Sequence, residues 1–372
     1  MRKLLLVAFS AIVVYVSVTT AADTLPERLS DKDFWELSVA LSEPAGIFLS
    51  ENVLSNESGF PFLIPELQRK AGNGGVYLGV GPEQNFSYIA GLQPSMAFII
   101  DIRRENLIEH LLYKALFELS ADRIDFVSRL FSRARPRGLS PRATARELLN
   151  AVMSAPVNDR EFQTDLEKVE GFLRQQGFAL TPEEMNTLEH LHSVFRDFGP
   201  RVDYLSTGRM PGGRMDNMPT YADLMTETDA SGRERSYLSD EKSFQFVQDL
   251  QKRNLIVPVV GDFGGPKAIR AVGRYLRDHQ AVVTTFYVSN VEAYLFRSVA
   301  PGNPNGGAVN FYNNVRALPL TASSTFVRSI PLPTGRGDIF GWQSLVTASI
   351  QQTIKDMDAG ALNAYPNLFL PR

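Results

Sequence analysis

A short glycine turn followed by an acidic residue is the pattern in this sequence with the clearest chemical potential. Gly79-Val80-Gly81 follows the apolar run 76–78 and precedes a predicted helix over residues 85–90. Such a turn lets the backbone approach a ligand closely, and the amino end of the next helix favours negative charge. Asp101 ends the next predicted strand about twenty residues later, where a carboxylate can accept both hydroxyls of a ribose. The pair predicts a site for a nucleotide-type ligand.

Structural explanations compete with that interpretation. Glycine at a strand-to-helix turn often meets only a backbone requirement, and Asp101 can instead cap a helix or form an ion pair with Arg103 or Arg104. The third glycine of the dinucleotide fingerprint is absent, since Gln84 occupies its position. A pyrophosphate would therefore fit less closely, which counts against NAD or FAD.

A second glycine turn follows a similar pattern later in the chain. The apolar strand 255–260 ends in Gly261-Asp262-Phe263-Gly264-Gly265, a helix is expected over 267–278, and a β-rich run over 281–288 follows. Right-handed crossovers place both glycine turns at the carboxyl edge of one sheet. The predicted strands 76–78 and 97–100 lack polar alternation, which is typical of a parallel sheet covered on both faces. We therefore expect an α/β fold with a mostly parallel sheet.

Polar and aromatic residues near this edge are candidates for contacts with a substrate. Asp262 and Glu292 are candidate general bases if burial raises the pKa of their carboxyls. We expect Asn290 and Tyr287 to contact a substrate, with Tyr221 as a further aromatic wall. The competing interpretation for Asn290 is that it caps the helix beginning near residue 291.

The order of strand, Gly-x-Gly turn, helix and acid-ending strand resembles the first two motifs of the class I S-adenosylmethionine-dependent methyltransferases. The residues that carry the resemblance are Tyr77-Leu78-Gly79-Val80-Gly81-Pro82-Glu83-Gln84-Asn85 and Phe98-Ile99-Ile100-Asp101. The segment 259–288 is similar to that family's fourth strand, helix and fifth strand. The runs 101–106 and 286–292 also resemble an uncharacterised, often exported bacterial family with this outline.

The resemblance implies a Rossmann-like, methyltransferase-type sheet with S-adenosylmethionine as cofactor. It assigns Gly79 and Gly81 to the methionine part and Asp101 to the ribose, and Asn85 is also expected to bind the cofactor. It places Asp262 opposite the donor methyl, but the usual Asn/Asp-Pro-Pro-aromatic run is missing there, which counts against methylation of nucleic-acid bases. Two residues of the polar loop 50–57 would close over the amino-acid end of the cofactor, although an ordinary turn explains them equally well: Asn56 and Glu57.

The N-terminus has the layout of a secretory signal peptide. Arg2-Lys3 precedes a mostly apolar run over 4–18, and cleavage is expected after Ala22. The alternative is an uncleaved anchor, but an apolar run of about fifteen residues is short for a bilayer that needs roughly twenty. We therefore expect an exported protein, periplasmic or extracellular, with no stable membrane span after cleavage.

Composition excludes several kinds of site. The chain has no cysteine, which excludes disulfides and thiolate chemistry, and a net charge of -3 counts against a nucleic-acid binder. The arginines between 123 and 146 are explained more simply by a solvated helical face than by phosphate contacts. A histidine zinc site is not expected, because all four histidines fall in helical patterns and the spacing of two of them does not face one side of a helix. They are His110, His190, His192 and His279. Serine-hydrolase and P-loop motifs are absent from the sequence.

The predicted organisation has four parts: the signal peptide (1–22), an N-terminal segment with the first half of the α/β domain (23–119), a helical and irregular insertion or lid (120–240), and the second half with a tail (241–372). Helices are expected to begin at Ser140-Pro141 and Thr181-Pro182, and the tail 342–357 is expected to be a helix. The third strand of the sheet is unplaced, with 201–205 as the candidate.

Two functional hypotheses follow from these patterns. The first is an exported methyltransferase-like enzyme that moves a methyl group to a small molecule or a protein side chain. The second is an exported, non-catalytic binding or scaffold protein that retains the fold. The glycine turn with Asp101 favours the first, and the signal peptide favours the second, because adenosylmethionine is made in the cytosol.

Overall fold

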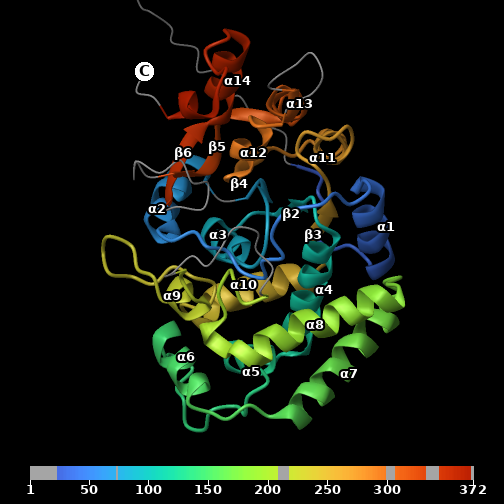
Figure 1. Cartoon of the computed structure of the whole chain (residues 1–372), viewed down its shortest axis with the longest axis vertical. Helices are drawn as coiled ribbons and strands as arrows, with labels where there is room; N and C mark the ends of the chain where they lie inside the picture. Colours follow the sequence, from blue (N-terminus) through green and yellow to red (C-terminus); the bar gives the residue numbers. More distant parts are fainter. Residues whose placement is uncertain (1–22, 73, 208–217, 299–305, 332–342, 370–372) are drawn as a thin grey trace, which may run out of the picture.

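The computed structural model describes residues 23–72, 74–207, 218–298, 306–331 and 343–369. They contain a six-stranded sheet in the order β3-β2-β1-β4-β5-β6 (Figure 1). All neighbours run parallel except β6, which is antiparallel to β5. The expectation of an α/β fold with a mostly parallel sheet is confirmed. The strands are β1 (Val76–Gly79), β2 (Met96–Asp101), β3 (Ile256–Val260), β4 (Val283–Ser289), β5 (Leu320–Pro331) and β6 (Gln343–Ser349).

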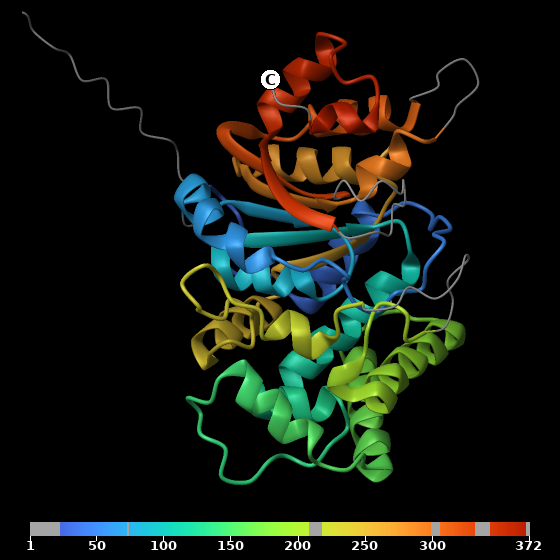
Figure 2. The same cartoon turned by 60° about the vertical axis from the view of Figure 1, so that its left-hand side comes forward.

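Helices cover both faces of this sheet (Figure 2). The first three strands are buried along their whole length, as their unbroken apolar sequences require. One face carries α11 (Ala268–Asp278), α12 (Val291–Leu295), α13 (Gly306–Val315) and α14 (Ile350–Asp358). The other face carries α2 (Phe60–Ala71), α3 (Gln84–Leu92), α4 (Arg104–Leu119) and α10 (Glu241–Lys252), while α1 (Asp31–Leu41) packs against β3. A short 3-10 turn, η2 (Tyr365–Leu368), follows α14.

The helices of the segment 120–240 extend away from the sheet beyond α4 (Figure 1). They are α5 (Arg123–Leu130), α6 (Ala145–Met153), α7 (Asp159–Gln175), α8 (Pro182–Phe198), the 3-10 turn η1 (Gly199–Arg201) and α9 (Tyr221–Met225). The predicted start at Thr181 is confirmed, because Thr181 and Glu184 form a capping box. The start at Ser140 is wrong, because Thr144 caps α6 with Glu147.

The third strand position is filled from an unexpected part of the chain. Residues 201–205 form no strand, and Asp203 makes only an isolated bridge to Thr220. β3 lies beside β2 at the edge of the sheet. The segment 256–288 therefore supplies the third and fourth strands of the sheet, and not the fourth and fifth as the resemblance implies. The tail also differs from the prediction, because β6 precedes the helix α14. The expected helix over 342–357 is therefore confirmed only in its second half, because residues 343–349 form an edge strand.

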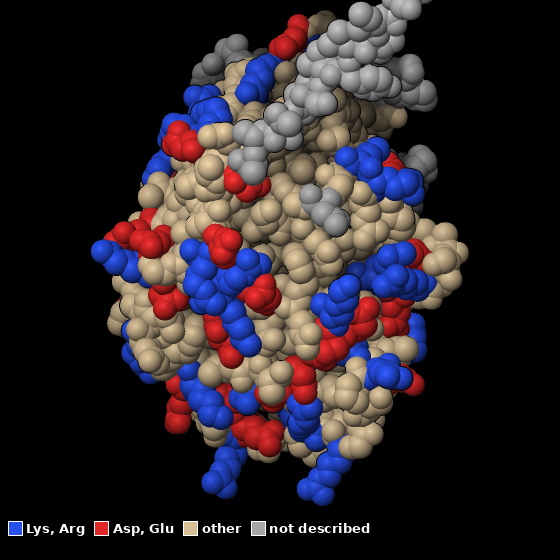
Figure 3. Space-filling model, turned by 180° about the vertical axis from the view of Figure 1, so that it is seen from behind, with Lys and Arg blue, Asp and Glu red and all other residues tan. Residues whose placement is uncertain are grey.

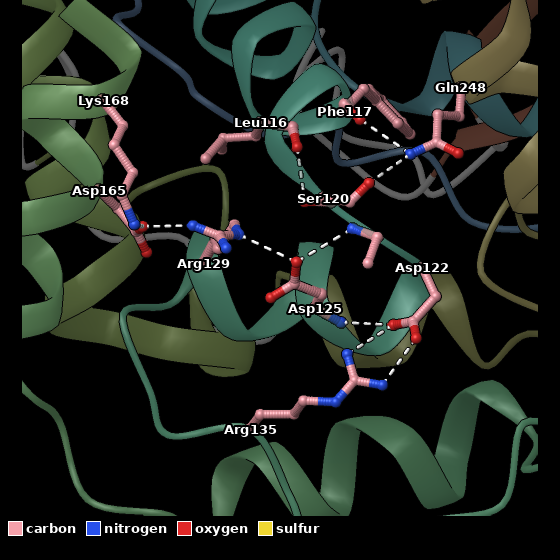
Figure 4. A network of polar contacts seen from close by, with 11 residues as sticks. Leu116, Phe117, Ser120, Asp122, Asp125, Arg129, Arg135, Asp165, Lys168 and Gln248 are labelled. Atoms are coloured by element: carbon pink, nitrogen blue, oxygen red, sulfur yellow. Dashed lines mark hydrogen bonds and ion pairs between the residues drawn. The ribbon is translucent and has the colours of Figure 1, made fainter.

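Two arginines of α5 serve as internal clamps, and Figure 4 shows one of them, Arg129. The expectation of a solvated helical face is wrong for Arg123 and Arg129, whereas Arg135, Arg137, Arg142 and Arg146 are exposed as expected. Arg123 is buried and donates to the carbonyl oxygens of Leu238 and Pro141. Arg129 joins α5 to α7 through Asp165, at 2.5 Å. These bonds satisfy backbone carbonyl and carboxylate groups within the segment 120–240.

On the face in Figure 3, basic and acidic side chains of the described residues are interspersed, without a large patch of one sign. Within the described ranges, no helix is both long enough and apolar enough to cross a membrane. The predicted signal peptide, 1–22, lies outside the described residues.

Candidate functional site

A cavity of about 310 Å³ opens at the carboxyl edge of the sheet. The strand order reverses there between β1 and β4, which is the position where open α/β sheets bind ligands. Each of four neighbouring strands contributes to its wall at or just beyond its end: Gly81 after β1, Asp101 in β2, Asp262 after β3, and Ser289 with Asn290 at β4.

The glycine turn forms one wall of this cavity and is held from behind by Asn85. The amide nitrogen of Asn85 donates to the carbonyl oxygens of Val80 at 3.0 Å, Gly81 at 3.1 Å and Pro82 at 2.7 Å. A Cβ on Gly79 would lie 1.9 Å from Oδ1 of Asn85, so glycine is required there by close approach. Gly81 has a φ of 77°, and a Cβ built on it meets no atom within 4 Å. Gly81 therefore faces open space, whereas Gly79 and Asn85 shape the turn.

Asp101 lines the cavity but is already paired. Its Oδ1 accepts from the backbone nitrogen of Arg103 at 2.9 Å and from Nε of Arg103 at 3.2 Å, and its Oδ2 lies 3.4 Å from an Arg103 guanidinium nitrogen. Another guanidinium nitrogen donates to the carbonyl oxygen of Asn52 at 3.0 Å, which ties β2 to the loop before α2. The ion-pair interpretation of Asp101 is thus what the structure shows, and its two oxygens still border the cavity.

The position of β3 changes where Asp262 lies. Because β3 is next to β2, Asp262 borders the side of the cavity beyond Asp101, away from β4. Its Oδ1 accepts from the backbone nitrogen of Gly264 at 2.8 Å, and the side chain is exposed. The buried ring of Phe263 lies beside it in the same wall.

The end of β4 supplies the opposite wall. Ser289 has a φ of 51°, which is uncommon for a residue other than glycine. Such backbone conformations often occur at functional sites. Asn290 precedes α12, yet its side chain makes no capping hydrogen bond. In the described part of the chain the amides of Asn290 and Asn56 both border the cavity without a hydrogen-bond partner, so both are available to a ligand.

Glu57 lies beneath this wall and reaches the cavity through two other side chains. The carboxylate accepts from the hydroxyl of Tyr287 at 2.5 Å and from the hydroxyl of Ser289. Burial raises the pKa of the Glu57 carboxyl, and bonds from Ser289, Tyr287 and Ser329 offset part of that rise. Tyr287 and Ser289 both line the cavity, whereas Glu57 does not.

Of the predicted residues that do not line the cavity, Gly79, Asn85 and Glu57 stand behind its wall, and the other two point into the core. Glu292 is 1% exposed and forms an ion pair with Arg328, whose Nε lies 2.6 Å from Oε2. The hydroxyl of Tyr312 also donates to Glu292. Tyr221 is buried in α9, where its hydroxyl lies 2.5 Å from that of Tyr237. A carboxylate or an aromatic ring that follows a strand in the sequence can point into the core. Both Glu292 and Tyr221 do so.

Sequence reasoning missed several residues of the wall. Phe48 and Tyr294 meet edge to face, with ring centroids 5.2 Å apart, and both line the cavity with the buried Tyr204. They come from the loop before α2, from α12 and from the segment after η1, so no local spacing joins them. Arg103 is not among the missed residues, because the sequence already offers it as an ion-pair partner of Asp101.

Behind the glycine turn lies a buried group of titratable side chains. Neither oxygen of Glu83 has a hydrogen-bond partner among the described residues, and burial raises its pKa to about 8. Nε2 of His110 lies 2.9 Å from the carbonyl oxygen of Gly81, and burial lowers its pKa to about 4. Burial, and then the charge of Glu83, raise the pKa of Glu109 in α4. Across the described ranges, no three histidine, aspartate or glutamate side chains are grouped to hold a metal ion.

Comparison with known proteins gives one family. A domain family described as a domain of unknown function (DUF7790) matches residues 53–359, which is most of the chain. The match includes the glycine turn, Asp101, the helical segment and β4. A comparison with curated proteins finds no match.

Proposed function

Because this chain belongs to the DUF7790 family of domains of unknown function, we propose its function from the cavity itself. The proposal is an exported protein with a Rossmann-like, methyltransferase-type fold that binds S-adenosylmethionine at the carboxyl edge of its sheet. It transfers the methyl group to a small molecule or a protein side chain outside the cytoplasm.

The observation that supports this proposal is the meeting of Gly81, Asp101 and Asn290 around one cavity at the reversal of strand order. Gly81 offers backbone open to solvent, Asp101 a carboxylate, and Asn290 an amide without a partner in the described chain. Adenosylmethionine carries groups that suit these three: an amino-acid end, two ribose hydroxyls and a sulfonium methyl. A cavity of about 310 Å³ is at the lower end of the range of small-ligand sites.

The strand order gives the ligand a direction. With the ribose at Asp101 on β2, the base extends towards β3, where Asp262 can accept from an exocyclic amino group and Phe263 borders the ring. The amino-acid end extends the other way, towards Gly81 and Asn56. The reacting end then lies near Asn290 on β4, so Asp262 is assigned to the base and is no longer a candidate general base.

Bound adenosylmethionine supplies an electrophilic methyl group. The protein's task is then to orient the acceptor nucleophile and to receive its proton. With Glu292 enclosed by Arg328, the carboxylate that reaches the β4 side of the cavity is Glu57, through the hydroxyl of Ser289. An acceptor proton can pass to the hydroxyl oxygen of Ser289 while the Ser289 proton passes to Glu57. The raised pKa of Glu57 suits a proton acceptor.

A non-catalytic binding protein is the second candidate, and the pairing of Asp101 favours it. Both oxygens of Asp101 face Arg103, so a ribose must share them with a guanidinium. A protein that retained the fold without catalysis would need no free carboxylate at this position.

Calorimetric titration of residues 23–372 with adenosylmethionine and adenosylhomocysteine tests the proposal. We expect micromolar binding, which corresponds to about 8 kcal/mol. Absence of heat and of any thermal shift at millimolar ligand would reject the cofactor and leave the binding-protein candidate. Export is tested separately, by fractionation of cells that express the full chain and a variant without residues 1–22.

A further inference from the structure

A second and larger cavity, of about 600 Å³, lies between α4 and α8. Phe48 and Arg103 line both this cavity and the one at the sheet edge, so these two side chains stand in the wall between them. The guanidinium of Arg103 lies 5.9 Å from the centre of the Phe48 ring, a cation–π distance that holds the wall together. The proposed cofactor role of the first cavity does not use this second one.

The lining of the second cavity is acidic. Three carboxylates border it, Glu51, Glu105 and Glu109. Its one arginine, Arg103, is neutralised by the ion pair with Asp101. Two uncharged acceptors from α8, Asn186 and Thr187, lie in the opposite wall. This arrangement favours a ligand that carries positive charge and several N–H donors.

Glu109 is the residue in this wall that most requires a partner. It is 2% exposed, and its buried Oε1 has no hydrogen-bond partner among the described residues. A buried carboxylate without a partner is costly, and native structures rarely retain one unless something compensates it. Glu105 lies one helical turn earlier on the same face of α4 and borders the same space.

We propose that the cavity between α4 and α8 binds a small organic cation with a primary ammonium group, and that Glu109 receives its charge. Glu105 and the side-chain oxygens of Asn186 and Thr187 accept the remaining N–H bonds. A metal ion fits less well, since the described side chains form no group of three metal ligands and the space is much larger than an ion needs. The site is independent of adenosylmethionine, although the shared wall would bring the amine next to the proposed methyl donor.

The test uses butane-1,4-diamine as the probe and butane-1,4-diol as its uncharged counterpart. Residues 23–372 are titrated with each by calorimetry at fixed ionic strength. We expect saturable binding of the diamine and at least tenfold weaker binding of the diol. Equal affinity for the two probes, or no saturable heat with the diamine, would overturn the proposal.

Variants locate the site. Glu109→Gln keeps the shape of the side chain and removes its charge, and we expect at least a tenfold loss of diamine affinity. Glu118→Gln, on the same helix but outside the cavity, should leave that affinity unchanged. If Glu109→Gln fails to fold, Glu105→Lys is used instead, because Glu105 is exposed. We expect it to lose diamine affinity as well. Unchanged diamine affinity in Glu109→Gln or in Glu105→Lys would overturn the assignment. Titration of Glu109→Gln with adenosylmethionine separates this result from the function of the first cavity.

Discussion

The hydroxyl of Tyr287 lies 2.5 Å from Oε2 of Glu57, which joins the end of β4 to the loop before α2. The neighbouring Ser289 donates to the other oxygen of the same carboxylate. One buried acid therefore holds two cavity-lining side chains in place. The wall opposite the glycine turn depends on this acid, which comes from a distant part of the sequence.

Tyr287→Phe removes one of the hydroxyl donors to Glu57. We expect the free energy of unfolding to fall by about 1–3 kcal/mol, because a buried carboxylate loses a hydrogen bond that nothing else supplies. Chemical denaturation measures the change. Tyr294→Phe is the control, because no hydrogen bond is found at its hydroxyl in the described chain, and it should change stability little. Equal stability of both variants would show that the Tyr287 bond contributes nothing.

Asp101→Asn tests the ribose contact. The amide keeps the shape of the side chain but weakens charge-assisted bonds, so we expect adenosylmethionine affinity to fall by roughly 10- to 100-fold. Calorimetry gives the affinity, and a melting curve shows whether loss of the Arg103 pair unfolds the protein. A folded variant that binds as tightly as the wild type would remove Asp101 from the site.

A matched pair of glycine variants separates close packing from backbone strain. Gly81→Ala meets no atom but must adopt a φ of 77°, so we expect a loss of about 1–2 kcal/mol in stability. Gly79→Ala places a methyl group against Asn85 and should be worse, because the amide that holds the turn must move. Denaturation midpoints compare the two variants. The reverse order would show that Asn85 does not fix the turn.

Glu292→Gln should act on stability and not on binding. Removal of one partner from a buried ion pair costs about 3–5 kcal/mol, because Arg328 is left without compensation. The control is Glu36→Gln, at an exposed pair with Lys32, where less than about 1 kcal/mol is expected. If Glu292→Gln were as stable as the wild type but lost adenosylmethionine binding, Glu292 would act directly at the site and the structural assignment would be wrong.

Glu83 makes stability depend on pH. Burial raises its pKa to about 8 in the folded state, against 4.5 for the unfolded chain. Between these values the folded state holds a proton that the unfolded state has lost, so stability is greatest below pH 4.5 and falls as the pH rises towards 8. Each pKa unit corresponds to about 1.4 kcal/mol.

Glu83→Gln removes this contribution. We expect the variant to match the wild type at acidic pH and to be more stable than it at pH 8, with urea midpoints as the measurement. His110 has the opposite sign, because its lowered pKa removes stability as the pH falls from 6.5 to about 4. Because His110 is present in both proteins, the difference in stability between the wild type and Glu83→Gln at each pH reports the contribution of Glu83 alone. A variant that shows the same slope as the wild type above pH 5 would contradict the account.

The sequence was sufficient for the parts of the sheet that are continuous along the chain. The turn at Gly79–Gly81, the acid at Asp101 and the strand ends at 260 and 289 were placed correctly, because unbroken apolar runs between glycine turns have few other structures. The cap at Thr181 followed from a local pattern as well. These features depend on neighbours within a few residues.

The remainder depends on contacts that no local pattern contains. The place of β3 beside β2 is decided by packing after the helical segment, and so is the role of Asp262. Arg123 belongs to a helix with a polar sequence, yet it is buried because distant carbonyl oxygens receive its N–H groups. Glu292 was misjudged for the same reason, since Arg328 lies in a strand much later in the chain.

The strand order also governs when the sheet can form during synthesis. Val76 in the central strand pairs with Met96 on one side, but with Val283 on the other, and Ala97 pairs with Ile256. Both long-range partners emerge only after the helical segment, and such a high contact order slows folding. For the export proposed above, that delay is useful. A chain that must cross a membrane unfolded has a longer interval to do so before its sheet closes.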